Sequence, residues 1–227
     1  MLPRFAAPAA NLPHPPPVPP PIALALPLPL PLPPVHRYEA LSKVKVSGDD
    51  QVLVVGLGPV GMCAAMLAKA MGASSVVGID TEESRCKLAA KFCTSVLKVH
   101  DSVLPDVLHL SDKGQGFEKV IDCSGSNAGR LLGIRATRKW GSMVLVGEGG
   151  PMAMPNVSDE LIHDQKTLVG SWVSSTWRMQ ELVEKLVRWQ IHPEALVTHR
   201  YALADVGEAY RTMAGGASGK VAVVFDD

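Results

Sequence analysis

Three glycines and one acid are the residues of this chain whose types and spacing could do chemistry. Gly56, Gly58 and Gly61 form a G-x-G-x-x-G motif directly after the apolar run 52–55, and Asp80 follows 24 positions after the first glycine. Gly56 lets the chain turn sharply out of a buried strand, and Gly58 lets the backbone approach a pyrophosphate. Gly61 lets the following helix pack close to its strand. The motif predicts a site for an adenine dinucleotide.

The elements around the motif supply the rest of such a site. A helix that starts near Pro59 would point unpaired N–H groups and the positive end of its dipole at the phosphates. Asp80 closes a second apolar strand, 75–79, where its carboxylate can accept both ribose hydroxyl protons. The acid would repel a 2′-phosphate, and Thr81 and Glu82 follow it instead of an arginine. We therefore expect NAD rather than NADP.

Composition indicates a globular domain with one sizeable core. The chain has 227 residues, zero formal net charge and 47% hydrophobic residues. Because the chain has neither net charge nor basic clusters, it offers no basic surface that would bind nucleic acid or an anionic membrane. The cysteines show no C-x-x-C spacing, which is typical of reduced cysteines in a cytoplasmic protein. They are Cys63, Cys86, Cys93 and Cys123.

Residues 1–37 are a different kind of sequence. They hold 14 of the 19 prolines, no acidic residue and only two positive charges, Arg4 and Arg37. The alternate prolines at 27–31 forbid a helix and remove strand donors, so the segment cannot span a membrane. It lacks the helical core of a signal peptide and the arginines of a transit peptide. We expect a disordered proline-rich tail, with a ligand for a proline-recognition domain as the alternative.

From residue 38 onward, strand patterns alternate with helix patterns. This alternation predicts an α/β fold: a Rossmann-type doubly wound parallel sheet, whose ligands bind at the carboxyl ends of the strands. The glycine turn, Asp80, 123–125 and 147–148 all follow strands and would meet at that edge. The predicted strands are 51–55, 75–79, 95–97, 117–122, 141–146, 167–172 and 221–225. The predicted helices are 38–45 (the end of a helix), 59–71, 82–92 with Thr81 as N-cap, 103–110, 127–139, 159–164, 177–190 and a capped helix at 205–213.

Four stretches of the chain carry a family resemblance. In their order and spacing they resemble the medium-chain, zinc-containing alcohol, polyol and threonine dehydrogenases, over residues 38–225. The resemblance implies an NAD-binding Rossmann domain at 38–190, a C-terminal segment of the catalytic domain at 191–227, and hydride transfer between a primary or secondary alcohol and NAD. The stretches are 52–80, 117–125, 140–147 and 198–221.

The same resemblance assigns roles to individual residues. Arg85 would lie near the adenosine end of the cofactor, and Lys220 would approach it from the C-terminal segment. Cys123, Ser124 and Gly147 would line the nicotinamide pocket through their backbones. The pyrophosphate and the adenosine ribose would be held by Gly56, Leu57, Gly58, Pro59, Val60, Gly61 and Asp80.

The chain departs from this family in its zinc ligands. Relatives carry an N-terminal catalytic domain with Cys, His and Glu or Asp ligands, and that pattern is missing before residue 38. The seven histidines form neither H-E-x-x-H nor a Cys/His cluster, so we predict no metal site and no catalytic residue. We expect a fragment, inactive by itself, that binds NAD and acts on an alcohol or polyol only when the catalytic half is supplied.

Other readings of the chain stay open. A non-catalytic NAD-binding or dimerising module is the main one, and the apolar strand 167–172, expected at an edge of the sheet, would pair two copies into a homodimer. A methyltransferase is another, since that fold also uses a glycine turn and an acid after the second strand. Gly61, one helical turn after Gly58, favours a dinucleotide.

Overall fold

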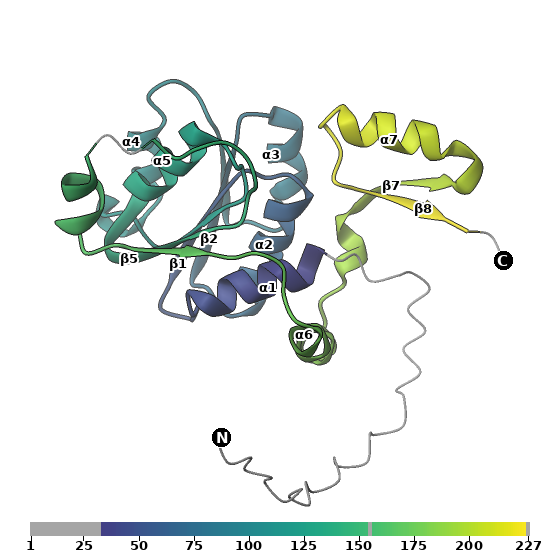
Figure 1. Cartoon of the computed structure of the whole chain (residues 1–227), viewed down its shortest axis with the longest axis horizontal. Coiled ribbons are helices and arrows are strands. Elements are labelled where there is room, and N and C mark those ends of the chain that lie inside the picture. Colours follow the sequence, from purple (N-terminus) through teal and green to yellow (C-terminus); the bar gives the residue numbers. More distant parts are fainter. Residues whose placement is uncertain (1–32, 154–155, 226–227) are drawn as a thin grey trace, which may run out of the picture. The chain divides into compact units, whose positions relative to one another are not determined.

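The computed structural model describes residues 33–153 and 156–225, and their core is a six-stranded parallel sheet (Figure 1). The strand order is β3-β2-β1-β4-β5-β6, and every neighbouring pair is parallel. This order confirms the predicted doubly wound α/β fold. The strands are β1 (Gln51–Val55), β2 (Ser75–Asp80), β3 (Ser95–Lys98), β4 (Phe117–Asp122), β5 (Thr137–Leu145) and β6 (Thr167–Gly170). The helices are α1 (Pro33–Lys43), α2 (Pro59–Ala70), α3 (Glu83–Ala89), α4 (Leu104–His109), α5 (Asn127–Ala136), α6 (Thr176–Trp189) and α7 (Val206–Ala214).

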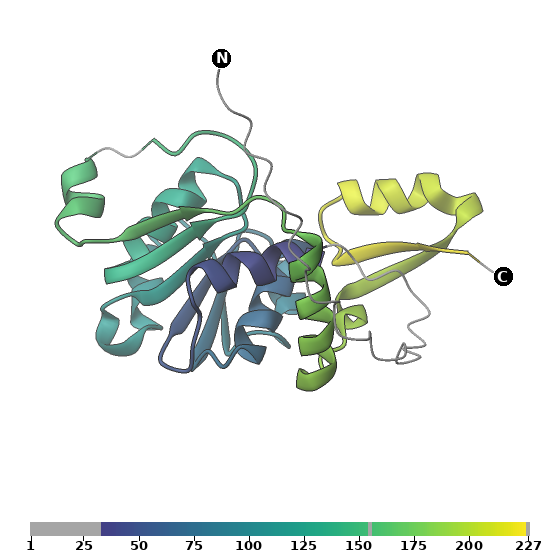
Figure 2. The same ribbon diagram turned by 60° about the horizontal axis from the view of Figure 1, so that its bottom comes forward.

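Helices lie on both faces of this sheet (Figure 2). Successive residues of a strand point to opposite faces, so each central strand contributes to two separate parts of the core. Val52 and Val54 pack with apolar residues of α1, α2, α3 and α6, whereas Leu53 and Val55 pack with residues of α4 and α5. The continuous apolar run of β1 therefore reflects burial on both sides.

Two helix starts differ from the sequence prediction. α1 begins at Pro33, within the segment expected to be tail, because proline suits the first position of a helix. The rest of that expected tail, residues 1–32, lies outside the described residues. Thr81 does not cap α3: the N-cap position is Glu82, whose backbone N–H donates to Asp80 Oδ1 at 2.8 Å. The carboxylate at the end of β2 thus accepts from the N–H of the N-cap residue, and no side chain caps α3.

The chain changes from helix to strand earlier than predicted between α5 and β5. α5 ends at Ala136, three residues before the expected end, and Thr137 already has extended backbone with its hydroxyl donating to Gly133 O at 2.8 Å. Extra residues in β5 are absorbed by an irregularity opposite β4, where Phe117 pairs with Thr137 but Lys119 pairs with Ser142. The capped helix expected at 205–213 is α7, and its N-cap residue Asp205 makes no side-chain capping bond.

A cluster of charges fixes α6 against α1. Glu181 accepts hydrogen bonds from the Tyr38 hydroxyl at 2.6 Å and from Arg178 at 2.6 Å, and Lys185 Nζ lies 3.2 Å from the same carboxylate. Tyr38 is 1% exposed, so its hydroxyl depends on this carboxylate for a partner. These donors, the Tyr38 hydroxyl first and then Arg178, lower the pKa of Glu181 from 4.5 to about 2.

We expect the free energy of unfolding to depend on pH through Glu181. Its contribution is fully present above pH 4.5 and is lost as the pH falls toward 2, because only then does the folded chain take up the proton. Glu181→Gln should cost about 1 kcal/mol at pH 7 and progressively less at lower pH, measured by urea unfolding. The control Glu184→Gln, exposed on the same helix, should follow the wild-type profile. A constant cost of Glu181→Gln across this range would contradict the assignment.

The C-terminal part forms a small sheet of its own. β7 (Val197–Ala202) and β8 (Lys220–Val224) pair in parallel, with α7 between them in sequence. Arg85 Nε donates to Gly216 O at 2.6 Å and Lys91 Nζ to Ala195 O at 2.9 Å, which joins this part to α3 and the residues after it. Among the described helices, none is long and apolar enough to cross a membrane.

Candidate cofactor-binding site

The glycine motif forms a tight turn between β1 and α2. Gly56 has φ +90°, a left-handed conformation that favours glycine, and a Cβ there would lie 2.8 Å from Ser124 N. A Cβ on Gly61 would lie 1.8 Å from the carbonyl oxygen of Gly56, so only glycine allows α2 to start this close to the strand. Gly58, the N-cap of α2, has no atom within 4 Å of the place a Cβ would take. The turn is therefore closed toward the sheet and open at the helix N-terminus.

Asp80 joins this turn to the end of β2. It is 5% exposed, and its Oδ2 accepts a hydrogen bond from Leu57 N at 2.6 Å. The Nη1 atom of Arg85 lies 3.7 Å from the same oxygen. The carboxylate is thus held in place beside the glycine turn, and it retains acceptor capacity for a further donor.

A second turn follows β4 at the same edge of the sheet. Cys123 N donates to Val55 O at 2.8 Å, and Ser124 donates through both its N and its Oγ to Asp122 Oδ1, at 3.0 and 2.7 Å. Burial raises the pKa of the Cys123 thiol to about 12, and that of Cys63 likewise. The neutral form of both thiols is therefore favoured near pH 7, which disfavours either as a nucleophile.

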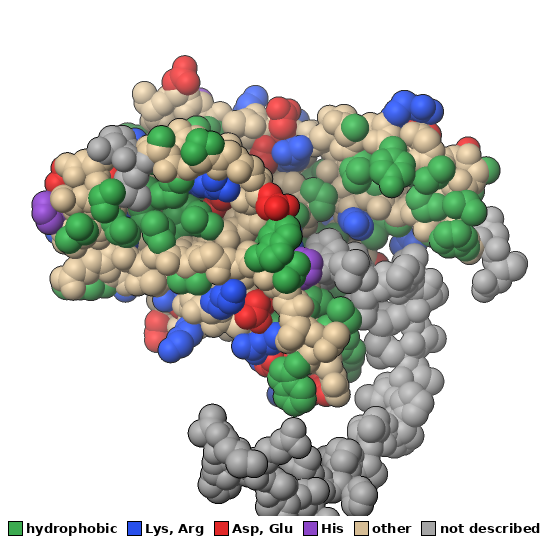
Figure 3. Space-filling view, in the orientation of Figure 1, with side chains coloured by type: hydrophobic (Ala, Val, Ile, Leu, Met, Phe, Trp, Pro, Cys, Tyr) green, Lys and Arg blue, Asp and Glu red, His purple; other side chains and the backbone are tan. Residues whose placement is uncertain are grey.

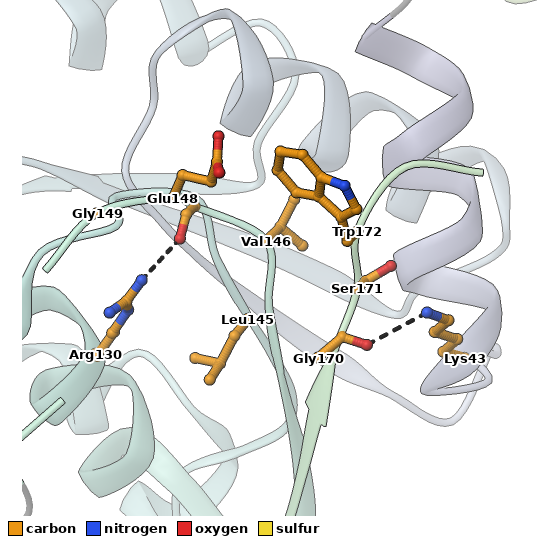
Figure 4. Close-up of a pocket in the computed structure, with 10 residues that line it drawn as sticks. Lys43, Arg130, Leu145, Val146, Glu148, Gly149, Gly170, Ser171 and Trp172 are labelled. Atoms are coloured by element: carbon orange, nitrogen blue, oxygen red, sulfur yellow. Dashed lines mark hydrogen bonds between the residues drawn. The ribbon is translucent and has the colours of Figure 1, made fainter. Parts of the chain in front are cut away.

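A pocket of about 550 Å³ opens beside the loop that follows β5 (Figure 4). Its wall includes 145–149, the Arg130 side chain from α5, and 170–172 at the end of β6 and just beyond it. Lys43 reaches it from α1 and donates to Gly170 O at 3.3 Å. Sequence reasoning named Gly147 but missed Arg130, Lys43 and Trp172, since their approach depends on how α1, α5 and β6 pack around the sheet.

The structure brings most of the predicted site residues together. The glycine turn 56–61, Asp80, Cys123, Ser124 and Gly147 all follow strands at the carboxyl edge of the large sheet. Arg85 is linked to this group through Asp80. Lys220 is not part of the same sheet, because it begins β8 and pairs in register with Val197 of β7.

The metal donors of the chain are scattered. Over 33–153 and 156–225, no three His, Cys, Asp or Glu side chains are grouped so that they could hold a metal ion. His163 is exposed and lies 3.1 Å from Asp159, and His100 lies 3.0 Å from Asp106. The donors described do not fit a zinc site.

Three features together define a Rossmann-type domain: the strand order, the glycine turn between β1 and α2, and the acid at the end of β2. Comparison with known proteins then gives the family. The family model described as zinc-binding dehydrogenase matches residues 59–188, more than half of the chain. The chain belongs to this family of zinc-type alcohol dehydrogenases, which confirms the resemblance stated from its motifs.

Individual relatives agree with the family. The chain is 40% identical over 193 residues to an uncharacterised zinc-type alcohol dehydrogenase-like protein, YphC, of Escherichia coli, covering 84% of this chain and 54% of that protein. It is 31% identical over 179 residues to human sorbitol dehydrogenase, covering 78% of this chain and 50% of that enzyme. The crystal structure of an alcohol dehydrogenase from Thermotoga maritima has the same fold, with a TM-score of 0.78 and 23% identity over 86% of this chain and 55% of that one. The chain spans about half the length of the curated relatives it matches.

Proposed function

We propose that this chain is the NAD-binding part of a zinc-type alcohol or polyol dehydrogenase. The observation that carries the proposal is the buried carboxylate of Asp80, 2.6 Å from Leu57 N and next to the open N-terminus of α2. A carboxylate in this position suits the hydroxyls of an adenosine ribose, and the helix terminus suits a pyrophosphate. When bound, NAD supplies the acceptor for a hydride from the alcohol.

The chain's own residues would bind and orient that cofactor. The backbone of Gly56, Leu57, Gly58, Pro59, Val60 and Gly61 would surround the pyrophosphate. Asp80 would accept from the ribose, with Arg85 beside it. Cys123, Ser124 and Gly147 would line the nicotinamide end, next to the pocket beside the β5 loop. Lys220, the first residue of β8, would approach from the small C-terminal sheet.

Calorimetric titration of the purified chain with NAD tests this proposal directly, together with thermal melts. At NAD concentrations 100-fold above Kd, the folded state should gain about 2.7 kcal/mol by mass action, which raises the melting temperature. AMP should bind more weakly than NAD because it lacks the pyrophosphate bridge and the nicotinamide half. A melting temperature that ignores NAD, with no heat of binding, would contradict the proposal.

We expect the chain by itself to oxidise no alcohol or polyol and to bind no stoichiometric zinc. The physical reason is that zinc needs three or four ligands placed close together, and the described residues contain no such group of His, Cys, Asp or Glu. Elemental analysis of the purified protein and an assay for NADH formation with sorbitol and short alcohols measure both. One zinc per chain together with turnover would overturn this expectation.

The edge strand β6 favours association of two copies, which also serves the alternative of a dimerising module. β6 is the last strand of the sheet and pairs only with β5 among the described strands, as the sequence predicted. Hydrophobic side chains reach the surface in Figure 3, and the exposed ones include Trp172 and Val173 just after β6. An unpaired edge of this kind promotes pairing between chains.

We therefore expect a homodimer or a soluble aggregate at micromolar concentration, measured by light scattering after size exclusion. Thr167→Lys places a charge on this edge and should shift the population toward monomer. A wild-type chain that stays monomeric at all concentrations would exclude the association, and would leave the NAD titration unaffected.

A further inference from the structure

Arg130 stands at a place where helix energetics alone do not favour a cation. It lies in the first turn of α5, whose N-cap is Ser126, and the dipole makes this end of a helix positive. Its side chain is nevertheless only 12% exposed, and the Asp122 carboxylate beside it is fully buried. A buried arginine against the dipole needs specific partners, and the structure supplies them on the cofactor side of the sheet.

The guanidinium connects the ends of two neighbouring strands. Nε lies 3.4 Å from Oδ2 of Asp122, the last residue of β4. Nη2 donates to Gly147 O at 2.8 Å, and Nη1 donates to Gly150 O, both in the loop after β5. In Figure 4 the Arg130 side chain reaches up from α5 to this loop. All three nitrogens contact acceptors of the protein, so the side chain holds the loop to the end of β4.

The loop itself has little else to fix it. Three of its four residues, 147–150, are glycines, which lose more conformational freedom on ordering than other residues. It packs backbone to backbone on the turn after β4: a Cβ on Gly147 would lie 2.3 Å from Gly125 N. Two further hydrogen bonds hold its ends: Gly147 N donates to Asp122 O at 2.9 Å, and Ala153 N, beyond the loop, donates to Asn127 Oδ1 at 2.7 Å.

We propose that Arg130 is a positioning residue for the nicotinamide end of the cofactor. By joining Asp122 to the carbonyls of Gly147 and Gly150, it orders the glycine loop before the ligand arrives, so that binding need not bear that ordering cost. The inference rests on the proposed function, because it needs a nicotinamide beside Gly147. It goes beyond that function in assigning the shape of this end of the site to one side chain that does not touch the cofactor.

The test compares two ligands that differ only at the nicotinamide end, NAD and ADP-ribose, by calorimetric titration of the full chain. Arg130→Met should raise the Kd for NAD about tenfold and leave the Kd for ADP-ribose within about twofold, since the ordering cost falls on the loop alone. Arg130→Lys keeps a cation near Asp122 but has no fork to reach both carbonyls, so it should give an intermediate loss. The matched control is Arg135→Met. Arg135 lies on the same helix and forms an ion pair with Glu160, and the loss of this pair should change neither Kd.

Distinct outcomes separate this inference from the proposed function. If Arg130→Met weakens NAD and ADP-ribose equally, or leaves both unchanged, the positioning role is wrong. If the wild-type chain binds neither ligand, the proposed function fails and the inference with it. Arg130→Met also leaves the Asp122 carboxylate buried without its cation, which can prevent folding. In that case the double variant Asp122→Asn, Arg130→Met, which removes both charges, takes its place. The same split between NAD and ADP-ribose is expected there.

Discussion

Replacing Asp80 with alanine is expected to raise the Kd for NAD about thirtyfold, or about 2 kcal/mol. The variant loses the acceptor for the ribose hydroxyls, and it also leaves Leu57 N and Glu82 N without the oxygens to which they donate. The Kd for NADP should change much less, because the carboxylate that repels a 2′-phosphate is gone as well. Fluorescence titration of both cofactors measures the gap, which should be wide in the wild type and narrow in Asp80→Ala.

A matched acid separates the local effect from a change in net charge. Asp159 is exposed and far along the chain, where it pairs with His163 and accepts a hydrogen bond from Asn156. Asp159→Ala should therefore leave both dissociation constants unchanged. Tighter binding of NADP than of NAD by the wild-type chain would show that Asp80 does not select the cofactor.

Gly61→Ala is expected to destabilise the fold by about 3 kcal/mol and to abolish binding of NAD. The new Cβ would lie 1.8 Å from Gly56 O and 3.3 Å from Val54 Cγ1, and the carbonyl belongs to backbone that cannot move aside cheaply. α2 must shift away from β1, which displaces the helix N-terminus from the place of the pyrophosphate. Urea unfolding and calorimetric titration measure the two effects.

Gly58→Ala provides the contrast within the same motif. No atom lies within 4 Å of its Cβ position, and its φ of −63° suits any residue. The free energy of unfolding of this variant should lie within about 0.5 kcal/mol of the wild-type value. The variant should nevertheless bind NAD more weakly, because its methyl group occupies the approach to the phosphates. Equal losses of stability in the two variants would contradict the distinction between a packing glycine and an approach glycine.

Patterns confined to short stretches of sequence could be predicted well. The strand starts at Gln51, Ser75 and Phe117 follow from apolar runs bounded by turn residues, and the parallel sheet follows from their alternation with helices. The placement of Gly56, Gly61 and Asp80 also follows from spacing, since one β-α-β unit fixes all three. Local periodicity and tertiary packing agree there.

Features set by distant backbone could not be predicted. The partners of Arg130 are carbonyl oxygens, which every residue has, so nothing in the sequence distinguishes Gly147 and Gly150 as acceptors. The Asp80 carboxylate accepts from Glu82 N just before α3, because the turn of the chain brings the two groups together. The early start of β5 at Thr137 depends on pairing with Phe117, which no local pattern encodes.

The contacts of Arg85 link the small C-terminal sheet to the proposed cofactor site. One guanidinium lies 3.7 Å from the Asp80 carboxylate and donates to Gly216 O at 2.6 Å. A ligand that favours one orientation of the Arg85 side chain changes how strongly the 215–219 turn packs against it. By linkage, packing of the turn must change the affinity for that ligand by the same factor. Proteolysis or mutation in that turn should then change the affinity for NAD at the proposed ribose site beside Asp80. The 215–219 turn would therefore act on the affinity of the site in the same way as a bound second ligand.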